Sequence, residues 1–419
     1  MEHIQIIFIL SIIFGAYMAW NIGANDVANA FGTSVGSKAL TIGAAVGLAA
    51  VFEFAGAFFV GGHVTETIRK GMVDHDIVAA EPVLFAIGMT AALLAAAIWL
   101  NLASKWGWPV STTHSIVGAV IGFGLVLAGT AAINWPKVWQ VVMSWVVSPL
   151  VGGLLSVLVY LAFVLPIYRS REPGKLLRRL VPLATGLVFF LLTLSMVYKG
   201  LKNLNMNLSF GGACLWGLAI GALAAFITYL IIKRIPLKEE TDPVKKFKQT
   251  EPIFAVLQII TASYTAFAHG ANDVANAVGP LAAVHSVWKA HGAELVAKAP
   301  VPNWILLLGG VFIVIGLATF GYRVMQTIGR KITSITPSRG FAAEFGAATT
   351  VLICSRLSLP VSTTHTLVGA VIGVGLARGM RSLDMKVVRD IGASWLYTIP
   401  FTAVLTILLF LGMRAIFSA

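Results

Sequence analysis

Apolar runs of about 20 residues recur along the whole of this 419-residue chain, and that is the length a helix needs to cross the hydrocarbon core of a bilayer. Only 11% of the residues are charged, whereas a soluble domain carries roughly 25%. Twelve runs are predicted as spans, at residues 4–22, 40–62, 83–103, 110–130, 138–165, 180–198, 208–232, 252–268, 303–322, 340–356, 361–378 and 391–416. The sequence therefore predicts an all-α polytopic membrane protein with about twelve transmembrane helices.

The net charge of +13 has two readings, nucleic-acid binding and membrane topology. The basic residues gather in short segments between apolar runs, at 166–179, 233–251, 323–339 and 378–390, and the loop 63–82 is acidic. A single order of membrane crossings places all four basic segments in the cytoplasm and the acidic loop outside. We therefore expect no nucleic-acid partner, a multi-pass protein of the plasma membrane, and both termini on the extracytoplasmic side.

Two motifs occur twice. Gly23-Ala-Asn-Asp-Val-Ala-Asn-Ala30 recurs from Gly270, 247 residues later, and Pro109-Val-Ser-Thr-Thr-His114 recurs from Pro360, 251 residues later. An odd number of predicted crossings separates the copies, so the repeats should be inverted, as in many secondary transporters. The predicted organisation is a five-span repeat at 1–165, two linking helices with cytoplasmic loops at 166–251, and a second five-span repeat at 252–419.

Helices in both repeats are expected to be interrupted. Residues 23–36 and 270–284 are too short to span a bilayer alone and contain Gly and Pro, so we interpret them as half-helices that continue the preceding spans. In transporters with inverted repeats, such breaks surround the binding site near the middle of the membrane.

The first motif supplies amides and a carboxylate inside an apolar run, where an ionised Asp costs about 2.5–3.5 kcal/mol unless it is compensated. Its two copies are Asn25, Asp26 and Asn29, and Asn272, Asp273 and Asn276. Their oxygen atoms are the hard ligands that a small alkali cation prefers, so we predict sodium sites here. The alternative is helix capping, at which Asn and Asp are also good.

The second motif resembles a helix start, with Pro followed by hydroxyl residues before an apolar run. Free backbone N–H groups and three hydroxyls would form an anion site, and two facing copies could enclose a tetrahedral oxyanion. The predicted phosphate ligands are Ser111, Thr112 and Thr113, and Ser362, Thr363 and Thr364. An ordinary cap with hydroxyl bonds to the helix backbone is the alternative. For His114 and His365, a structural hydrogen bond is favoured over a role with substrate or protons.

Two further acids, Glu53 and Glu344, lie inside apolar runs and should face protein or water rather than lipid. They are not equivalent in the repeats, because the offset of the second motif places Leu93 opposite Glu344. Either could carry a proton or donate a hydrogen bond during transport. The alternative is a structural pairing with backbone or hydroxyl groups.

The duplicated motifs resemble those of the inorganic phosphate transporter (PiT) family, also called solute carrier family 20, over nearly the whole chain. The resemblance implies sodium- or proton-coupled uptake of inorganic phosphate, and the family's signature acids are similar to Asp26, Asp273, Glu53 and Glu344. Segment 233–251 is a short counterpart of the long central loop of animal members. Some bacterial relatives carry sulfate, which leaves the anion open.

These observations predict a secondary active transporter that couples sodium to phosphate uptake by alternating access, with a proton-coupled phosphate or sulfate permease as the alternative. Sodium ions, co-transported, would neutralise Asp26 and Asp273, and phosphate would then bind between the two Ser-Thr-Thr helix starts. Two other classes compete, an intramembrane hydrolase using the paired carboxylates and a passive anion channel. We expect no enzyme activity. A homodimer is compatible with the sequence, which does not determine the oligomeric state.

Overall fold

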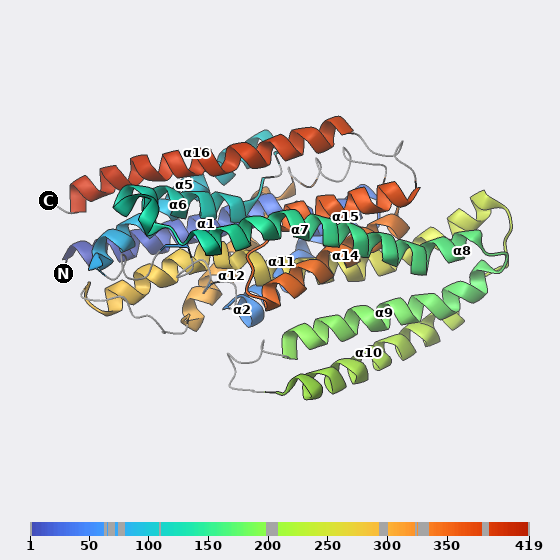
Figure 1. Ribbon diagram of the computed structural model, residues 1–419. Coiled ribbons are helices and arrows are strands. Elements are labelled where there is room, and N and C mark those ends of the chain that lie inside the picture. Colours follow the sequence, from blue (N-terminus) through green and yellow to red (C-terminus); the bar gives the residue numbers. More distant parts are fainter. Residues whose placement is uncertain are drawn as a thin grey trace.

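The computed structural model describes residues 2–62, 65, 72–73, 80–108, 110–197, 208–292, 301–322, 325, 335–378 and 385–417. Outside them lie Pro109, most of the predicted acidic loop 63–82, and parts of the basic segments 323–339 and 378–390. The described chain is an elongated bundle of helices (Figure 1). Both termini lie at the same end of the bundle.

The helices are α1 (Glu2–Gly36), α2 (Ile42–Val60), α5 (Pro82–Trp106), α6 (Thr112–Ala128), α7 (Trp135–Val159), α8 (Leu165–Arg169), α9 (Pro173–Val197), α10 (Phe210–Lys233), α11 (Pro243–Lys289), α12 (Asn303–Phe320), α14 (Pro337–Arg356), α15 (Thr363–Arg378) and α16 (Met385–Phe417). A π turn, Tyr160–Val164, joins α7 to α8. Within the described residues, ten helices are long and apolar enough to cross a membrane. The predicted all-α polytopic fold is confirmed.

Residues 23–36 and 270–284 continue the preceding helices, as expected, but neither α1 nor α11 breaks at its Gly-Ala-Asn-Asp motif. Even Pro280 lies inside α11. The interruptions lie instead at the Pro-Val-Ser-Thr-Thr-His motifs, where the chain leaves α5 or α14 and turns back into α6 or α15. The first motif therefore occupies the interior of two long helices, and the second occupies two hairpin tips.

The two hairpins, α5–α6 and α14–α15, enter the bundle from opposite ends (Figure 1). Their tips meet, and the Thr113 hydroxyl donates a hydrogen bond of 3.0 Å to the Val361 carbonyl. The predicted spans 83–103 with 110–130, and 340–356 with 361–378, thus pair as two hairpins whose tips meet inside the bundle. The predicted side of every loop is unchanged by this pairing, because a hairpin and two successive crossings both return the chain to the side from which it came.

Glycines set how the repeats interlock. A Cβ atom on Gly23 of α1 would lie 2.0 Å from the carbonyl oxygen of Ile313 in α12. In the other half, a Cβ atom on Gly270 of α11 would lie 2.1 Å from the carbonyl oxygen of Glu53 in α2. Each long motif helix therefore packs backbone to backbone against the second helix of the opposite repeat, as small residues permit in membrane bundles.

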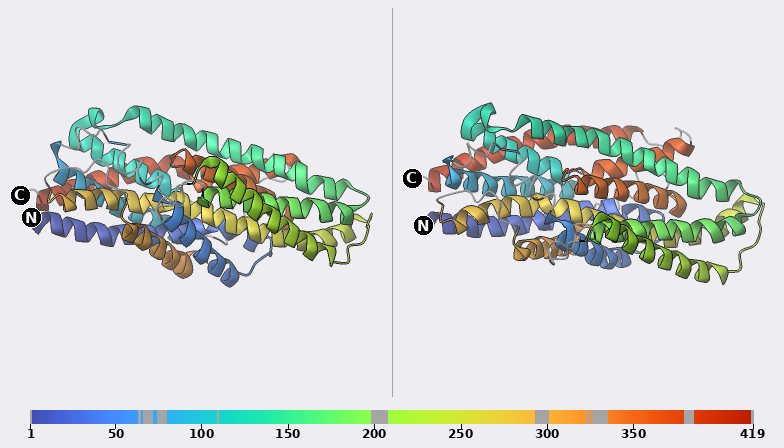
Figure 2. Two further views of the ribbon diagram at one scale, coloured as in Figure 1. Left: turned by 90° about the horizontal axis from the view of Figure 1, so that it is seen from below. Right: turned by 60° about the horizontal axis from the view of Figure 1, so that its bottom comes forward.

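The linking helices α9 and α10 form a pair along one side of the bundle, away from α16 (Figure 2). Gly186 and Gly221 lie where these two helices touch. Most of α10 is exposed and apolar, with Leu215 and Trp216 among its exposed side chains. Such a surface suits contact with lipid.

Asp242 lies immediately before α11 and caps its N-terminus. Its carboxylate accepts hydrogen bonds from the backbone N–H groups of Lys245 and Val244. These bonds favour the charged carboxylate, and the amide of Lys245 most of all holds the pKa of Asp242 below its ordinary value. The cap fixes where the longest helix of the bundle begins.

Candidate functional site

The six Asn and Asp side chains of the first motif are buried in the interior of the bundle, each no more than 1% exposed. They project from the interior of the unbroken helices α1 and α11, about two turns or more from either helix end. The capping alternative for this motif is therefore wrong. Six buried amides and carboxylates need partners of another kind, because an unpaired buried polar group costs about 1–3 kcal/mol.

The second motif forms helix starts, as predicted. The Ser111 hydroxyl accepts the backbone N–H of His114 at 3.1 Å, and the Ser362 hydroxyl accepts that of His365 at 3.2 Å. Both serines thus act as N-caps of α6 and α15. The remaining free N–H groups give each tip the positive end of a helix dipole.

The two motifs contact one another across the repeats. The Asn29 amide donates to the Thr364 hydroxyl at 2.8 Å. In the equivalent contact from the other repeat, the Asn276 amide donates to the hydroxyls of Thr112 and Thr113 at 3.2 and 3.3 Å. Thr363 binds within its own repeat and donates to Asp273 Oδ2 at 2.8 Å. The structure therefore brings both copies of both motifs to one place.

The tips are also tied to the helices through their backbone. Asn25 donates to the Trp108 carbonyl at 3.1 Å, and Asn272 donates to the Val361 carbonyl at 2.8 Å. Ser355 in turn donates to the Asn272 side-chain oxygen at 3.3 Å. Each hairpin tip is thus held against the motif helix of its own repeat, so movement of the tip would also displace the side chains of that helix.

Several oxygens of this site are buried without a hydrogen-bond donor among the described residues. They are Asp26 Oδ2 and the side-chain oxygens of Asn25, Asn29 and Asn276. Oxygen atoms of carboxylates and amides are suited to hard cations. These oxygen atoms therefore fit the predicted role of cation ligands, because their lone pairs are not already used by hydrogen bonds within the described residues.

A residue that the sequence reasoning missed lies at the centre of the site. His269 is 1% exposed, and its Nε2 lies 2.8 Å from Asp273 Oδ2 and 3.7 Å from Asp26 Oδ2. Ligand atoms of these three residues all lie within 4.8 Å of one another, close enough to hold one metal ion. The signal was present in the repeat itself, because His269 precedes Gly270 where Ile22 precedes Gly23.

Glu53 and Glu344, the two acids outside the motifs, occupy different surroundings. Glu53 Oε1 lies 3.3 Å from His269 Nδ1, so the histidine links Glu53 to the aspartates. Glu344 belongs to a separate cluster. It accepts hydrogen bonds from Thr33 and Ser34 of α1 and from Gln258 and Thr261 of α11.

The histidines of the second motif face each other between the two hairpins. The rings of His114 and His365 are 4.3 Å apart between centroids, and His114 lies 3.8 Å from the ring of Trp145. This packing agrees with the structural role that the sequence favours for them.

Comparison with known proteins gives the site its context. Residues 22–406 match the family described as the phosphate transporter family. A chain of Thermococcus kodakarensis named as a phosphate permease is 46% identical over 403 residues, covering 96% of each chain. The inorganic phosphate transporter 2-1 of Arabidopsis thaliana, named as chloroplastic, is 43% identical over 426 residues, covering 95% of this chain and 70% of the plant protein.

A solved structure named as the sodium-dependent phosphate transporter superposes with a TM-score of 0.90 at 40% identity, covering 98% of this chain and 99% of that one. The structural match and the sequence matches therefore both extend over nearly the full length of the chain. The chain is a multi-pass membrane protein and a transporter rather than an enzyme, and it belongs to the phosphate transporter family.

Proposed function

We propose that this protein is a sodium-coupled symporter that takes up inorganic phosphate by alternating access. The observation that carries the proposal is the meeting of two Asn-Asp segments and two capped helix starts in one buried site. The first pair offers oxygens to cations, and the second pair offers N–H groups and hydroxyls to an anion. The sodium dependence named for the structural relative supports the same cation.

Coupling follows from electrostatics in this site. Phosphate beside Asp26 and Asp273 would be repelled unless their charge is neutralised. A unit-charge contact at about 4 Å is worth ~4 kcal/mol at an effective dielectric constant of 20. Bound sodium turns that repulsion into attraction, so cation and phosphate should raise each other's affinity by the same factor.

The second candidate is proton-coupled transport, and the contact between His269 and three carboxylates favours it. Histidine can change charge near neutral pH, and an imidazolium between Asp273 and Glu53 would supply positive charge where a sodium ion otherwise would. Both candidates use the same acids, and they differ in which cation neutralises them. Sulfate remains a candidate anion, although it cannot donate a hydrogen bond to a carboxylate as protonated phosphate can.

Alternating access is supported by the arrangement of the repeats. Hairpins from opposite ends meet at the site, and the long helices α1 and α11 pass through it in opposite directions (Figure 1). Two inverted halves around a central site are the usual plan of secondary transporters. We place the protein in the plasma membrane with both termini outside, which agrees with the two termini lying at one end of the bundle.

Uptake of labelled phosphate into proteoliposomes tests the proposal, with sodium and pH gradients imposed separately. We expect accumulation above the equilibrium level under an inward sodium gradient, and loss of most uptake in Asp273→Asn. Accumulation under the pH gradient alone would establish the proton-coupled candidate instead. Equilibration without accumulation under either gradient would show a channel and overturn the proposal.

A further inference from the structure

Two basic segments that the transport site does not use, 166–179 and 233–251, meet at the end of the bundle opposite the termini (Figure 1). We call the surface that they form the basic end. Lys246 Nζ of the second segment donates hydrogen bonds to the carbonyls of Tyr168 and Ser170 in the first, at 3.2 and 2.7 Å. The two segments are therefore held together as one surface rather than as separate loops.

The basic end is strongly positive. It contains eleven lysines and arginines against five acids. Lys246 is buried, and the other ten cations are exposed: Arg169, Arg171, Lys175, Arg178, Arg179, Lys233, Arg234, Lys238, Lys245 and Lys248. Exposed like charges at this density repel one another, and an anionic partner would relieve that repulsion.

The acids of the basic end are used within it. Glu172 pairs with Lys175 at 3.0 Å. Glu239 accepts a hydrogen bond from the Gly174 backbone N–H at 3.2 Å, and Asp242 is the cap of α11 described above. In the part of the chain that the structure describes, no acid forms an ion pair with an arginine of this surface. The arginines therefore remain available to an anion from outside the chain.

The exposed cations begin where the exposed apolar surface of the linking helices ends. On α10 the exposed Ile231 is followed by Lys233 and Arg234. On α9 the exposed Arg179 lies one turn before the exposed Leu183, on the same face. Acyl chains that cover the apolar surface therefore bring their head groups to the level of the cations. A soluble anionic partner would gain nothing from this alignment.

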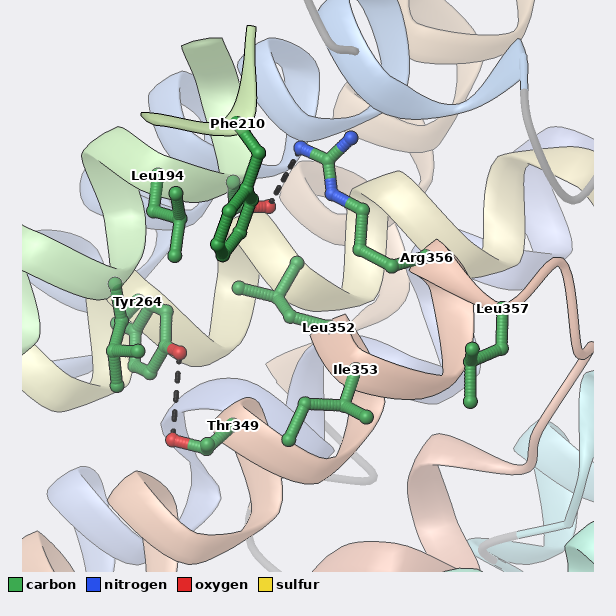
Figure 3. A pocket seen from close by; sticks show the side chains of 10 residues that line it. Leu194, Phe210, Tyr264, Thr349, Leu352, Ile353, Arg356 and Leu357 are labelled. Atoms are coloured by element: carbon green, nitrogen blue, oxygen red, sulfur yellow. Dashed lines mark hydrogen bonds between the residues drawn. The ribbon is translucent and has the colours of Figure 1, made fainter. Parts of the chain in front are cut away.

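An arginine beside the other end of α9 and α10 is placed differently. Arg356, the last residue of α14, extends into a groove of about 240 Å³ and donates to the Ser195 hydroxyl at 3.4 Å (Figure 3). Leu194, Phe210 and Leu352 line the same groove. Protein groups surround this cation, whereas the cations of the basic end face outward. Arg356 therefore provides a control for positive charge alone.

We propose that the basic end binds anionic phospholipids, with their phosphate groups at the exposed arginines and lysines and their acyl chains along α9 and α10. Clusters of roughly four to eight lysines and arginines directly beside a membrane helix are typical of surfaces that attract anionic head groups. Arginine also matches phosphate oxygens with paired N–H donors. This binding does not depend on the proposed transport function.

Electron paramagnetic resonance of spin-labelled lipids tests the binding. The full-length protein is reconstituted into phosphatidylcholine membranes that contain a trace of spin-labelled phosphatidylglycerol or phosphatidylcholine. The motionally restricted fraction of each label reports its association with the protein. We expect wild type to prefer phosphatidylglycerol by about twofold or more, and the preference should fall toward one in about 1 M NaCl, which screens exposed charges.

Neutral variants locate the preference on the surface. Arg178→Gln with Arg179→Gln, and Lys233→Gln with Arg234→Gln, should each remove at least about half of the excess association of phosphatidylglycerol. Arg178→Lys with Arg179→Lys keeps the charge and should keep most of the preference. Size-exclusion chromatography of each variant checks that it is folded.

Two controls separate the surface from net charge. Lys289→Gln with Arg414→Gln removes two exposed cations near the other ends of α11 and α16, and Arg356→Gln removes the cation in the groove. Both should prefer phosphatidylglycerol as wild type does.

The proposal would be overturned by equal preference in wild type and both neutral double variants, or by an equal loss in the controls. A wild-type preference that high salt leaves unchanged would also contradict it. Loss of the preference on addition of inorganic phosphate at constant ionic strength would assign the surface to free phosphate instead of lipid.

Discussion

The two crossings that interlock the repeats have the same backbone geometry and different chemistry. Where α11 crosses α2, His269 and Glu53 contact each other beside Gly270. Where α1 crosses α12, the corresponding residues beside Gly23 are Ile22 and Ile313, both fully buried. One crossing therefore carries a titratable pair next to the aspartates, and the other carries two apolar side chains of the same burial.

This difference shows which features the fold requires and which features serve the site. The glycines occur at both crossings because each backbone approach leaves no room for a side chain. The polar pair occurs at only one, so the crossing itself does not need it. We therefore assign His269 and Glu53 to the chemistry of the proposed cation and anion site.

Alanine at either motif glycine should have the largest effect. In Gly23→Ala and Gly270→Ala the new methyl group would lie about 2 Å from a backbone carbonyl oxygen, and backbone cannot move aside as a side chain can. Overpacking a well-filled interior costs about 1–3 kcal/mol, and we expect the upper end or more at both positions. Size-exclusion profiles and thermal melting of the detergent-solubilised protein measure the loss.

Gly43→Ala and Gly47→Ala are the matched controls, because a Cβ atom on either glycine of α2 would meet no other atom within 4 Å. Each should leave stability unchanged or raise it by about 0.5–1 kcal/mol, since alanine favours the helix. Marked destabilisation by Gly270→Ala but not by Gly23→Ala would show that the two crossings are not equivalent.

Replacement of the polar pair at the α11–α2 crossing by the two isoleucines of the α1–α12 crossing should have the next largest effect. His269→Ile leaves the Glu53 carboxylate buried without its partner and should lose about 3 kcal/mol of stability. The double variant Glu53→Ile with His269→Ile should recover part of that loss, because it removes the unpartnered carboxylate, although Asp273 still lacks its histidine contact. Glu53→Ile alone should be the least destabilised, because His269 keeps its contact with Asp273. His269→Ile and the double variant should lose most phosphate uptake, because the aspartates lose their histidine contact. Glu53→Ile should lose less, because His269 keeps its contacts with the aspartates and loses only its contact with Glu53.

Thermal melting of the four proteins gives the coupling between the two residues, and uptake in proteoliposomes gives their role. A double variant that transports like wild type would show that the pair only fills space. A double variant less stable than both single variants would show that the apolar crossing cannot be transplanted.

The sequence predicted the inverted repeat, the helix starts at the second motif and the residues that meet at the site, because each depends on local pattern and on duplication. Capping by Ser111 and Ser362 was only the alternative to their predicted role as phosphate ligands. The sequence placed the helix breaks at the wrong motif. Gly23 and Gly270 looked like breaks, whereas their role is to let a distant helix approach, and a single repeat does not reveal its partner. His269 was missed for a related reason, since its significance lies in contacts with α1 and α2 that tertiary packing creates.

The smallest effect should come from the tip hydroxyls, where the two halves are alike. Asn29 donates to Thr364, and Asn276 donates to its counterpart Thr113, so each threonine holds the motif helix of the opposite repeat. Replacement by the isosteric Val removes one hydrogen-bond acceptor, and each amide keeps a second one, Asp26 for Asn29 and Thr112 for Asn276. We therefore expect only the net value of one hydrogen bond to be lost, about 0.5–1.5 kcal/mol.

Thr113→Val and Thr364→Val should therefore raise the KM for phosphate by similar factors, roughly 2- to 10-fold for that energy range, and leave the folded yield unchanged. The corresponding Ser variants keep the hydroxyl and should recover most of the affinity. Equal factors would extend the symmetry of the backbone to the anion contacts. A large effect at Thr364 alone would instead assign the dominant contact to Asp26, because the Thr364 hydroxyl also lies 3.4 Å from Asp26 Oδ1. The two repeats would then differ in how they bind phosphate, as they differ at the crossing that contains His269.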